Sequence, residues 1–165
     1  MPEVLDRIRP ATPADAGELA TLRYEFRAAL DPSQEAFETF RARCTSWMAS
    51  RLATGVWRCW VAEREGRMVG TVWLFMIEKL PNPVAEPEQH GYVSSLYVRP
   101  ECRGSGLGSQ LLAKVLETCE AERCDAVFLW PTARSRSLYL RHGFEVQQDL
   151  LERRMTPAPA HRGRS

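Results

Sequence analysis

The sequence predicts an α+β fold built on a mixed sheet. Strand patterns at 56–63 and 68–77 are joined by Glu65-Gly66, a pair typical of a hairpin turn, so these strands should be antiparallel. Later in the chain, a helix pattern at 106–123 lies between strand patterns at 92–98 and 126–130. A helical crossover of this kind joins parallel strands. Antiparallel strands early and a crossover late therefore predict both kinds of pairing in one sheet.

Two helices should precede the hairpin. The segment 4–9 has a strand pattern, and Thr12-Pro13-Ala14-Asp15 after it combines a Thr cap, Pro at the first helical position and an acid in the first turn. That helix is predicted to run to about Ala29. Asp31-Pro32-Ser33-Gln34 repeats the same start signal and predicts a second helix that reaches Ala53.

The remaining elements complete one domain over residues 1–156. The segment 79–91 contains three prolines and is predicted to be a loop. A short helix near 135–142 and a final strand region from Phe144 to Met155 should follow the crossover. The tail 157–165 has little to bury and is expected to be mobile.

A glycine-rich segment, Arg103-Gly104-Ser105-Gly106-Leu107-Gly108, joins a predicted strand to a predicted helix. Glycine tolerates a positive φ and lets a ligand approach the backbone closely. The free N–H groups of the first helical turn and the helix dipole both favour an anion. The segment therefore predicts a site for a phosphate or a pyrophosphate.

Three glycine motifs compete for this segment. A nucleotide-binding P-loop needs a Gly-Lys pair followed by Ser or Thr, and that pair is missing. A dinucleotide fingerprint needs a third glycine where Ser109 stands, and its acidic residue would lie at the end of the next strand, whereas Asp125 lies at the start. The third option is Arg-x-x-Gly-x-Gly, formed here by Arg103, Gly106 and Gly108, which resembles the coenzyme A pyrophosphate loop of the GNAT superfamily of N-acetyltransferases.

The resemblance extends on both sides of this loop. The stretch 96–108 is similar to the fourth strand and phosphate loop of that family, and Leu138-Tyr139-Leu140-Arg141-His142-Gly143-Phe144 is similar to its Leu-Tyr-x-x-x-Gly-Phe segment. The opening Ile8-Arg9-Pro10-Ala11-Thr12 is similar to a family first strand. The resemblance spans roughly residues 5 to 155. It implies a mostly antiparallel central sheet flanked by helices, with splayed fourth and fifth strands.

The resemblance also implies an activity. The family uses acetyl-CoA as co-substrate, so the protein is expected to move an acetyl group to a primary amine by direct transfer in a ternary complex. The acceptor would be a small-molecule or peptide amine. The alternative is a catalytically silent acyl-CoA-binding module, which would keep the phosphate loop but lack a working acceptor site.

The resemblance places the coenzyme on particular residues. Pantetheine would pair with the backbone of Leu96, Tyr97 and Val98, and one of these N–H groups would steady the oxyanion. Thr132 stands where many members have Asn, and a coenzyme contact is expected there too. The pyrophosphate would lie on the amides of the loop and the first helical turn: Arg103, Gly104, Ser105, Gly106, Leu107, Gly108 and Ser109.

Tyr139 is the candidate catalytic residue, because a Tyr at this motif position in the family commonly lies near the coenzyme sulfur. A tyrosine pKa of about 10 keeps the hydroxyl protonated at neutral pH, so it can donate a proton to the departing thiolate. The alternative role for Tyr139 is packing of the last helix.

No general base is assigned. Some members have Glu early in the fourth strand, roughly where Tyr92 stands here, and Glu88 and His90 lie just before it.

The segment Arg23-Tyr24-Glu25-Phe26-Arg27 falls where the family often shapes its acceptor pocket. We expect a solvated face for Arg23 and Arg27, and pairing of Glu25 with a cationic amine is a weaker alternative. Trp57, Trp60 and Trp73 are expected to pack on the sheet.

Composition excludes other functions. The net charge of +1 provides no field that would draw the chain to nucleic acid, and no run of eighteen apolar residues predicts a membrane span. Five cysteines without a Cys-x-x-Cys pair favour free thiols in the cytoplasm and no metal site. The sequence does not determine the oligomeric state, and a homodimer stays open.

Overall fold

The computed structural model describes residues 6–32 and 35–156, which contain a five-stranded mixed sheet. Three pairs of neighbouring strands are antiparallel, and the last pair is parallel. The predicted α+β class and mixed sheet are therefore confirmed. The predicted first strand begins with residues 4 and 5, which lie outside the described residues. In spatial order the strands are β1 (Arg7–Pro10), β2 (Trp57–Arg64), β3 (Arg67–Glu78), β4 (Gln89–Val98) and β5 (Ala126–Phe128).

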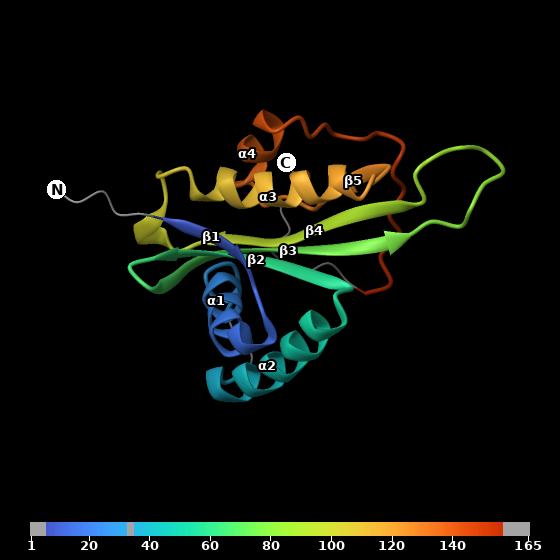
Figure 1. Ribbon diagram of the computed structural model, residues 1–165. Helices are drawn as coiled ribbons and strands as arrows, with labels where there is room; N and C mark the ends of the chain where they lie inside the picture. The colour runs from blue at the N-terminus through green and yellow to red at the C-terminus, as the bar shows by residue number, and fades with distance from the viewer. Residues whose placement is uncertain (1–5, 33–34, 157–165) are drawn as a thin grey trace.

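Helices cover both faces of the sheet (Figure 1). The helices α1 (Ala16–Ala28) and α2 (Phe37–Thr54) lie on one face, and α3 (Leu107–Ala121) and α4 (Arg136–Arg141) lie on the other. Each helical layer buries its own apolar cluster against the sheet. On the α3 side, the helix buries one stripe of side chains, as its apolar spacing predicts: Leu107, Leu111, Leu112, Val115 and Cys119.

The predicted start of the second helix is wrong. The helix α2 begins at Phe37 after an extended Ala36, several residues beyond the start signal at 31–34. Asp31 instead ends the first helical segment, because its backbone N–H donates to the Arg27 carbonyl and its carboxylate lies 3.6 Å from the Arg27 guanidinium. Ser33 and Gln34 lie outside the described residues.

The predicted final strand over 144–155 is also wrong, because the described chain has no strand after β5. The apolar residues of this segment do not share one parity, so neither face of a strand would be apolar. They are instead exposed: Val146, Leu150, Leu151 and Met155.

The strands β4 and β5 diverge, and this divergence positions the site. They pair only from His90–Ala126 to Tyr92–Phe128, so the edge of β4 from Val93 to Val98 has no partner from β5. The pairing of β3 with β4 is irregular between Thr71 and Trp73, opposite Ser95, which adopts a positive φ of 53°. An irregularity of this kind bends a strand away from its neighbour. The expected splay of the fourth and fifth strands is confirmed.

An ion pair at the start of α1 predicts a dependence of stability on pH. Arg9 bonds both carboxylate oxygens of Asp15 at 2.8 and 2.9 Å, and this contact lowers the pKa of Asp15 from 3.8 to about 2. The contribution is complete above pH 3.8 and is lost as the pH falls through about 2. We expect Asp15→Asn to lower the free energy of unfolding at neutral pH by about 2 kcal/mol.

Urea unfolding of the unmodified protein and of Asp15→Asn, at neutral pH and at about pH 2.5, measures the difference in free energy of unfolding, which should shrink in acid. The control is Glu152→Gln, which removes an exposed partner of Arg154. An Asp15→Asn cost that is the same at both pH values would contradict the assignment.

Candidate active site

The glycine-rich segment forms a left-handed loop that leads into α3. Gly104 has φ 81°, and Gly106, the residue before the helix, has φ 82°. A Cβ at Gly104 would meet no atom within 4 Å, so backbone conformation rather than crowding explains glycine there. Gln110 N donates to Gly106 O at 3.0 Å, the first bond of the helix, and no side chain caps the earlier amides. These amides of the first turn are therefore available to an anion.

A cavity of about 490 Å³ lies beside this loop and runs to the open edge of β4. Its charged lining residues are Arg103, Arg134 and Arg141, and no acidic side chain lines it. The cavity reaches both faces of the sheet, since Phe26 from α1 and Leu107 from α3 both line it. A polyanion with an elongated uncharged arm fits such a site, with the charges at the loop and the arm along β4.

The structure places ten of the twelve predicted coenzyme residues in the cavity wall: Leu96, Tyr97, Val98, Arg103, Gly104, Gly106, Leu107, Gly108, Ser109 and Thr132. Ser105 and Tyr139 are not part of this wall. The Ser105 hydroxyl donates to Cys102 O at 2.9 Å and receives a bond from Arg64, so it holds the loop in shape. Arg103 Nε similarly donates to Val98 O at 2.8 Å and ties the loop to the end of β4.

Thr132 and Ser135 form a reciprocal cap before α4. Their hydroxyls lie 2.9 Å apart, Thr132 N donates to Ser135 Oγ, and Ser135 N donates to Thr132 Oγ1. The Thr132 side chain is therefore already engaged in local structure, although it lies at the cavity. A contact from Thr132 to the coenzyme would add to this capping role.

Tyr139 lies in α4 with its ring in the core on the α3 side of the sheet and is 7% exposed. The ring packs edge-on against Phe144, with centroids 5.6 Å apart. Burial raises the pKa of Tyr139 to about 12, and an interaction with the Ser135 hydroxyl partly opposes this rise. Ser135 lines the cavity, whereas Tyr139 itself does not. The phenol stays protonated throughout the neutral range.

The candidate bases lie far from the coenzyme residues. His90 precedes Leu96 by six positions of β4, which corresponds to about 20 Å at ~3.3 Å per residue, and Glu88 lies before the strand begins. His90 Nδ1 is buried without a hydrogen-bond partner among the described residues. Neither side chain is placed to take a proton directly from an amine beside Leu96.

Glu25 and Arg23 differ from their sequence-based expectations. Glu25 accepts two bonds from Arg99, at 2.9 and 3.0 Å, so its carboxylate is occupied inside the protein. Arg23 is only partly exposed, and its Nη1 donates to the Ser95 hydroxyl at 2.7 Å. The expected solvated face is thus wrong for Arg23, because its position on α1 points it at β4. Arg27, one turn later, is exposed as expected.

The cysteines do not offer an activated nucleophile. All five are free, and Cys59, Cys102 and Cys119 are buried. Burial raises the pKa of Cys119 to about 12, and it raises that of Cys59 as well. A thiol held protonated is a poor nucleophile, so these side chains act in packing.

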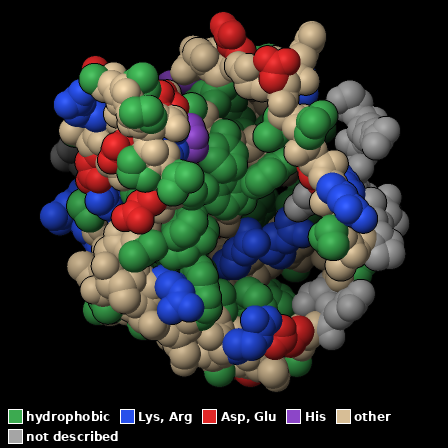
Figure 2. Space-filling model, turned by 90° about the vertical axis from the view of Figure 1, so that its right-hand side faces the viewer, with side chains coloured by type: hydrophobic (Ala, Val, Ile, Leu, Met, Phe, Trp, Pro, Cys, Tyr) green, Lys and Arg blue, Asp and Glu red, His purple; other side chains and the backbone are tan. Residues whose placement is uncertain are grey.

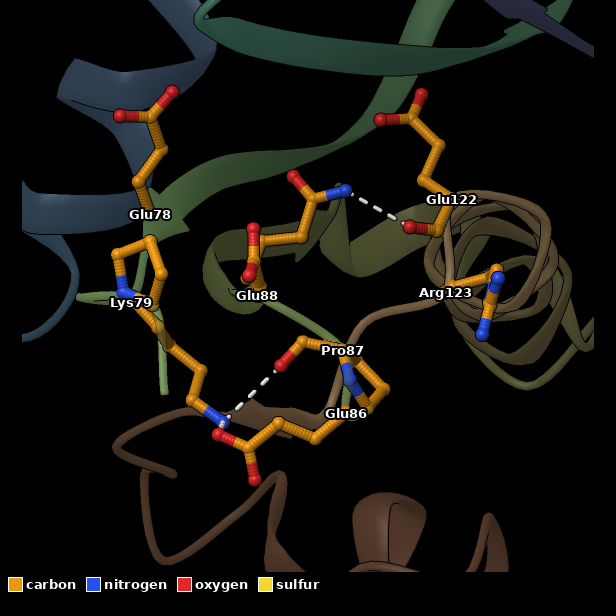
Figure 3. A pocket seen from close by; sticks show the side chains of 9 residues that line it. Glu78, Lys79, Glu86, Pro87, Glu88, Glu122 and Arg123 are labelled. Carbon is orange, nitrogen blue, oxygen red and sulfur yellow. Dashed lines mark hydrogen bonds and ion pairs between the residues drawn. The ribbon is translucent and has the colours of Figure 1, made fainter. Parts of the chain in front are cut away.

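A second cavity, of about 600 Å³, lies under the loop between β3 and β4 (Figure 3). Its lining is mostly polar, with Glu78, Glu86, Glu88 and Glu122 around it. Figure 3 shows Lys79 directed at the loop, where its Nζ lies 3.3 Å from Glu86 and 3.1 Å from Pro87 O. Lys79 also pairs with Asp125 at 2.6 Å. These contacts hold the loop against the start of β5.

The loop, the cavity and the splayed strand define an acyltransferase-type fold, and the sequence comparison identifies the family. The model of the Acetyltransferase (GNAT) family matches residues 20–144. The chain therefore belongs to the GNAT family of acetyltransferases.

Individual relatives agree with this assignment. An uncharacterized N-acetyltransferase from Archaeoglobus fulgidus is 32% identical over 109 residues, which span 63% of this chain and 65% of that protein, just under two thirds of its length. A "predicted acetyltransferase with acetyl-CoA" from Clostridium acetobutylicum has a TM-score of 0.76 at 20% identity, covering 92% of this chain and 97% of that one. A GCN5-related N-acetyltransferase from Ralstonia eutropha has a TM-score of 0.77 at 22% identity, covering 92% and 100%. The two solved structures show a shared fold.

Within residues 6–32 and 35–156, no helix is both long enough and apolar enough to cross a membrane.

Proposed function

We propose that this protein is an acetyl-CoA-dependent N-acetyltransferase that moves the acetyl group to a primary amine by direct transfer in a ternary complex. The observation that carries the proposal is the continuous cavity that joins the glycine loop to the open edge of β4. Membership of the GNAT family supports the same conclusion.

Each part of the cavity suits one part of the co-substrate. The first-turn amides of α3 face a region lined by Arg103, Arg134 and Arg141, which suits a pyrophosphate. Along β4, the backbone beside Leu96 and Val98 has no partner from β5. Apart from Val98 O, which accepts from Arg103 Nε, its polar groups can pair with the amides of pantetheine. This order directs the thioester toward Leu96 and Ser95.

The chemistry then requires few groups. The thioester supplies the acetyl group, and the amine nitrogen forms a bond to the carbonyl carbon while the carbon–sulfur bond breaks. A backbone N–H of β4 steadies the oxyanion. The Tyr139 hydroxyl gives its proton to the thiolate. Its high pKa keeps the phenol protonated, and therefore able to donate, at neutral pH. The attacking amine loses its proton to water, since Glu88 and His90 lie far from Leu96 and Glu25 is paired with Arg99.

A catalytically silent acyl-CoA-binding module is the second candidate. The distance of His90 and Glu88 from Leu96 favours it, because a working enzyme needs a route for the amine proton. The two candidates differ in one measurement. The enzyme releases free thiol from acetyl-CoA when amines are added, whereas the silent module binds acetyl-CoA and releases none with any amine of a broad panel.

The binding half of the proposal predicts the effect of Gly106→Asp. The substitution adds bulk and a negative charge beside the first-turn amides, at a φ of 82°. We expect the affinity for CoA to fall at least tenfold, which is about 1.4 kcal/mol. Calorimetric titration with CoA measures the change, and circular dichroism checks the fold.

Gly66→Asp is the matched control. Gly66 also has a positive φ, 74°, and a Cβ there would meet no atom within 4 Å, but it lies in the turn between β2 and β3. Its affinity for CoA should match that of the unmodified protein. A folded Gly106→Asp protein with unchanged affinity would overturn the proposed phosphate site.

A further inference from the structure

Aromatic side chains form a row across the face of the sheet that carries α1 and α2. Strand register places four of them directly opposite one another: Trp57 with Phe75, Phe75 with Tyr92, and Tyr92 with Phe128. Neighbouring centroids lie 4.8 Å apart for Trp57–Phe75 and 5.4 Å apart for Tyr92–Phe128. The paired positions across β2, β3, β4 and β5 are therefore all aromatic at this level of the sheet.

Two further tryptophans extend this aromatic row and remain open to solvent. Trp47 from α2 lies 5.6 Å from Trp57, and Trp130 after β5 lies 5.3 Å from Tyr92, measured between ring centroids. Trp47 is 41% exposed and Trp130 is 52% exposed. Figure 2 shows this end of the molecule, where hydrophobic side chains spread over the middle of the face and Lys or Arg side chains lie beside them in a hollow.

Arg23 supplies a cation next to this aromatic row. Its Nη1 bonds the Ser95 hydroxyl at 2.7 Å, and its guanidinium carbon lies 5.8 Å from the centre of the Phe26 ring. Burial and then the charge of Arg27 lower the pKa of Arg23, and the charges of Cys44 and Tyr92 oppose this shift. The bond to Ser95 places the guanidinium between α1 and β4, three strand positions from Tyr92.

Arg23 differs in its partners from three other sheltered arginines. Arg9, Arg64 and Arg99 each pair with a carboxylate at 2.9 Å or less. Among the described residues, no ion pair joins Arg23 to a carboxylate; its recorded polar partner is the neutral Ser95 hydroxyl. A partly desolvated cation without an anion is costly in a folded protein, and a bound anionic ligand offsets that cost.

Arg23 lies close to the cavity in which the reaction would take place. Ser95, its partner, directly precedes Leu96, which lines the cavity proposed for acetyl-CoA. Phe26, under the guanidinium, lines the same cavity. An anion on Arg23 would therefore lie beside the cavity proposed for acetyl-CoA.

We propose that the amine acceptor is an aromatic α-amino acid, with its carboxylate on Arg23 and its ring on the aromatic row. This inference rests on the proposed acetyltransferase function. The guanidinium has donors left after the bond to Ser95, and its planar fork matches a carboxylate. The α-amine is attached to the carbon next to the carboxylate, so binding of the carboxylate brings the amine to Leu96. The amine nitrogen gains the acetyl group, the coenzyme sulfur gains a proton, and the products are an N-acetyl amino acid and CoA.

The test uses four acceptors with the unmodified protein and acetyl-CoA. L-phenylalanine has both features, L-phenylalaninamide and phenethylamine lack the carboxylate, and L-alanine lacks the ring. We expect kcat/KM for L-phenylalanine to exceed that of each of the others at least tenfold, as measured by thiol release. Equal or better use of the amide or of phenethylamine would overturn the proposal, and better use of the amide would indicate peptide N-termini as acceptors.

Substitution of Arg23 tests the residue itself. Arg23→Gln should lower kcat/KM for L-phenylalanine at least tenfold and change that for phenethylamine less than threefold, so that the preference disappears. Arg27→Gln, one turn along α1 and exposed, should leave both values unchanged. If Arg23→Gln does not fold, Ser95→Ala replaces it and should lower the preference by a smaller factor, because it removes the recorded hydrogen-bond partner of Arg23.

A binding measurement separates failure of this inference from failure of the acetyltransferase function. N-acetyl-L-phenylalanine and N-acetylphenethylamine are titrated in the presence of CoA while tryptophan fluorescence is followed. The acid should bind at least tenfold more tightly, and Arg23→Gln should abolish the difference, even if no amine is ever acetylated. Equal affinity for both compounds would overturn the inference, whereas absence of turnover with all amines would overturn the proposed function alone.

Discussion

Tyr139→Phe is expected to lower kcat by about 10²- to 10⁴-fold while leaving the affinity for CoA nearly unchanged. The substitution keeps the ring, which is 7% exposed and packs on Phe144, and removes only the hydroxyl. That hydroxyl is kept protonated by burial, which raises its pKa to about 12, and it interacts with Ser135 in the cavity wall. Steady-state kinetics together with calorimetric CoA titration measure the two quantities.

Tyr24→Phe is the matched control for this experiment. Its hydroxyl bonds Glu35 O at 3.4 Å, and its ring packs on Phe37 and Phe40 of α2. Loss of that hydroxyl should change kcat less than threefold. Should product release limit turnover, a rapid-mixing measurement of the acetyl-transfer step replaces kcat, and an unchanged transfer rate in Tyr139→Phe would exclude the acid role.

Leu111→Ala is expected to lower the free energy of unfolding by about 2–5 kcal/mol, the usual cost of removing a fully buried leucine. Leu111 is 0% exposed and lies where α3 packs on β3. The contact is close, because a Cβ built at Gly70 of β3 would lie 3.2 Å from Leu111 Cδ1. Such a backbone-to-side-chain contact cannot close up around the smaller alanine, so a cavity remains.

Urea unfolding followed by circular dichroism measures this loss. Leu151→Ala provides the control, since Leu151 is 94% exposed and its truncation should change the free energy of unfolding by less than about 0.5 kcal/mol. A cost below about 1 kcal/mol for Leu111→Ala would show that the α3 interface is much looser than the structure indicates.

The elements that the sequence predicts well are those whose signals are local. The stripe from Leu107 to Cys119 repeats at helical spacing and becomes the buried face of α3. Glu65 and Gly66 both adopt a positive φ at the hairpin turn, as that dipeptide suggests. The glycine loop is predictable because left-handed positions before a helix favour glycine, and Gly104 and Gly106 adopt such a conformation.

The predicted start of the second helix and the predicted final strand are wrong because in both segments a local signal competes with distant contacts. Asp31-Pro32 has the composition of a helix start, but Asp31 is bound to Arg27 at the end of the preceding helix, and α2 begins at Phe37. Val146 and Leu151 resemble strand residues in composition, yet they have opposite parity and lie exposed. Composition alone does not reveal whether a segment has a neighbouring strand.

The sequence by itself determined the fold class, the glycine loop and the family resemblance, because turn chemistry, apolar periodicity and short motifs are properties of neighbouring residues. Only the tertiary structure decided which side chains meet across the sheet. Arg23 and Ser95 are 72 positions apart in the chain, and the aromatic row joins residues from α2 to the segment after β5. Strand register and helix packing bring these groups together, and neither can be derived from the residues next to Arg23. The proposed acceptor site is therefore a property of the fold, whereas the proposed coenzyme site is already present in the motif.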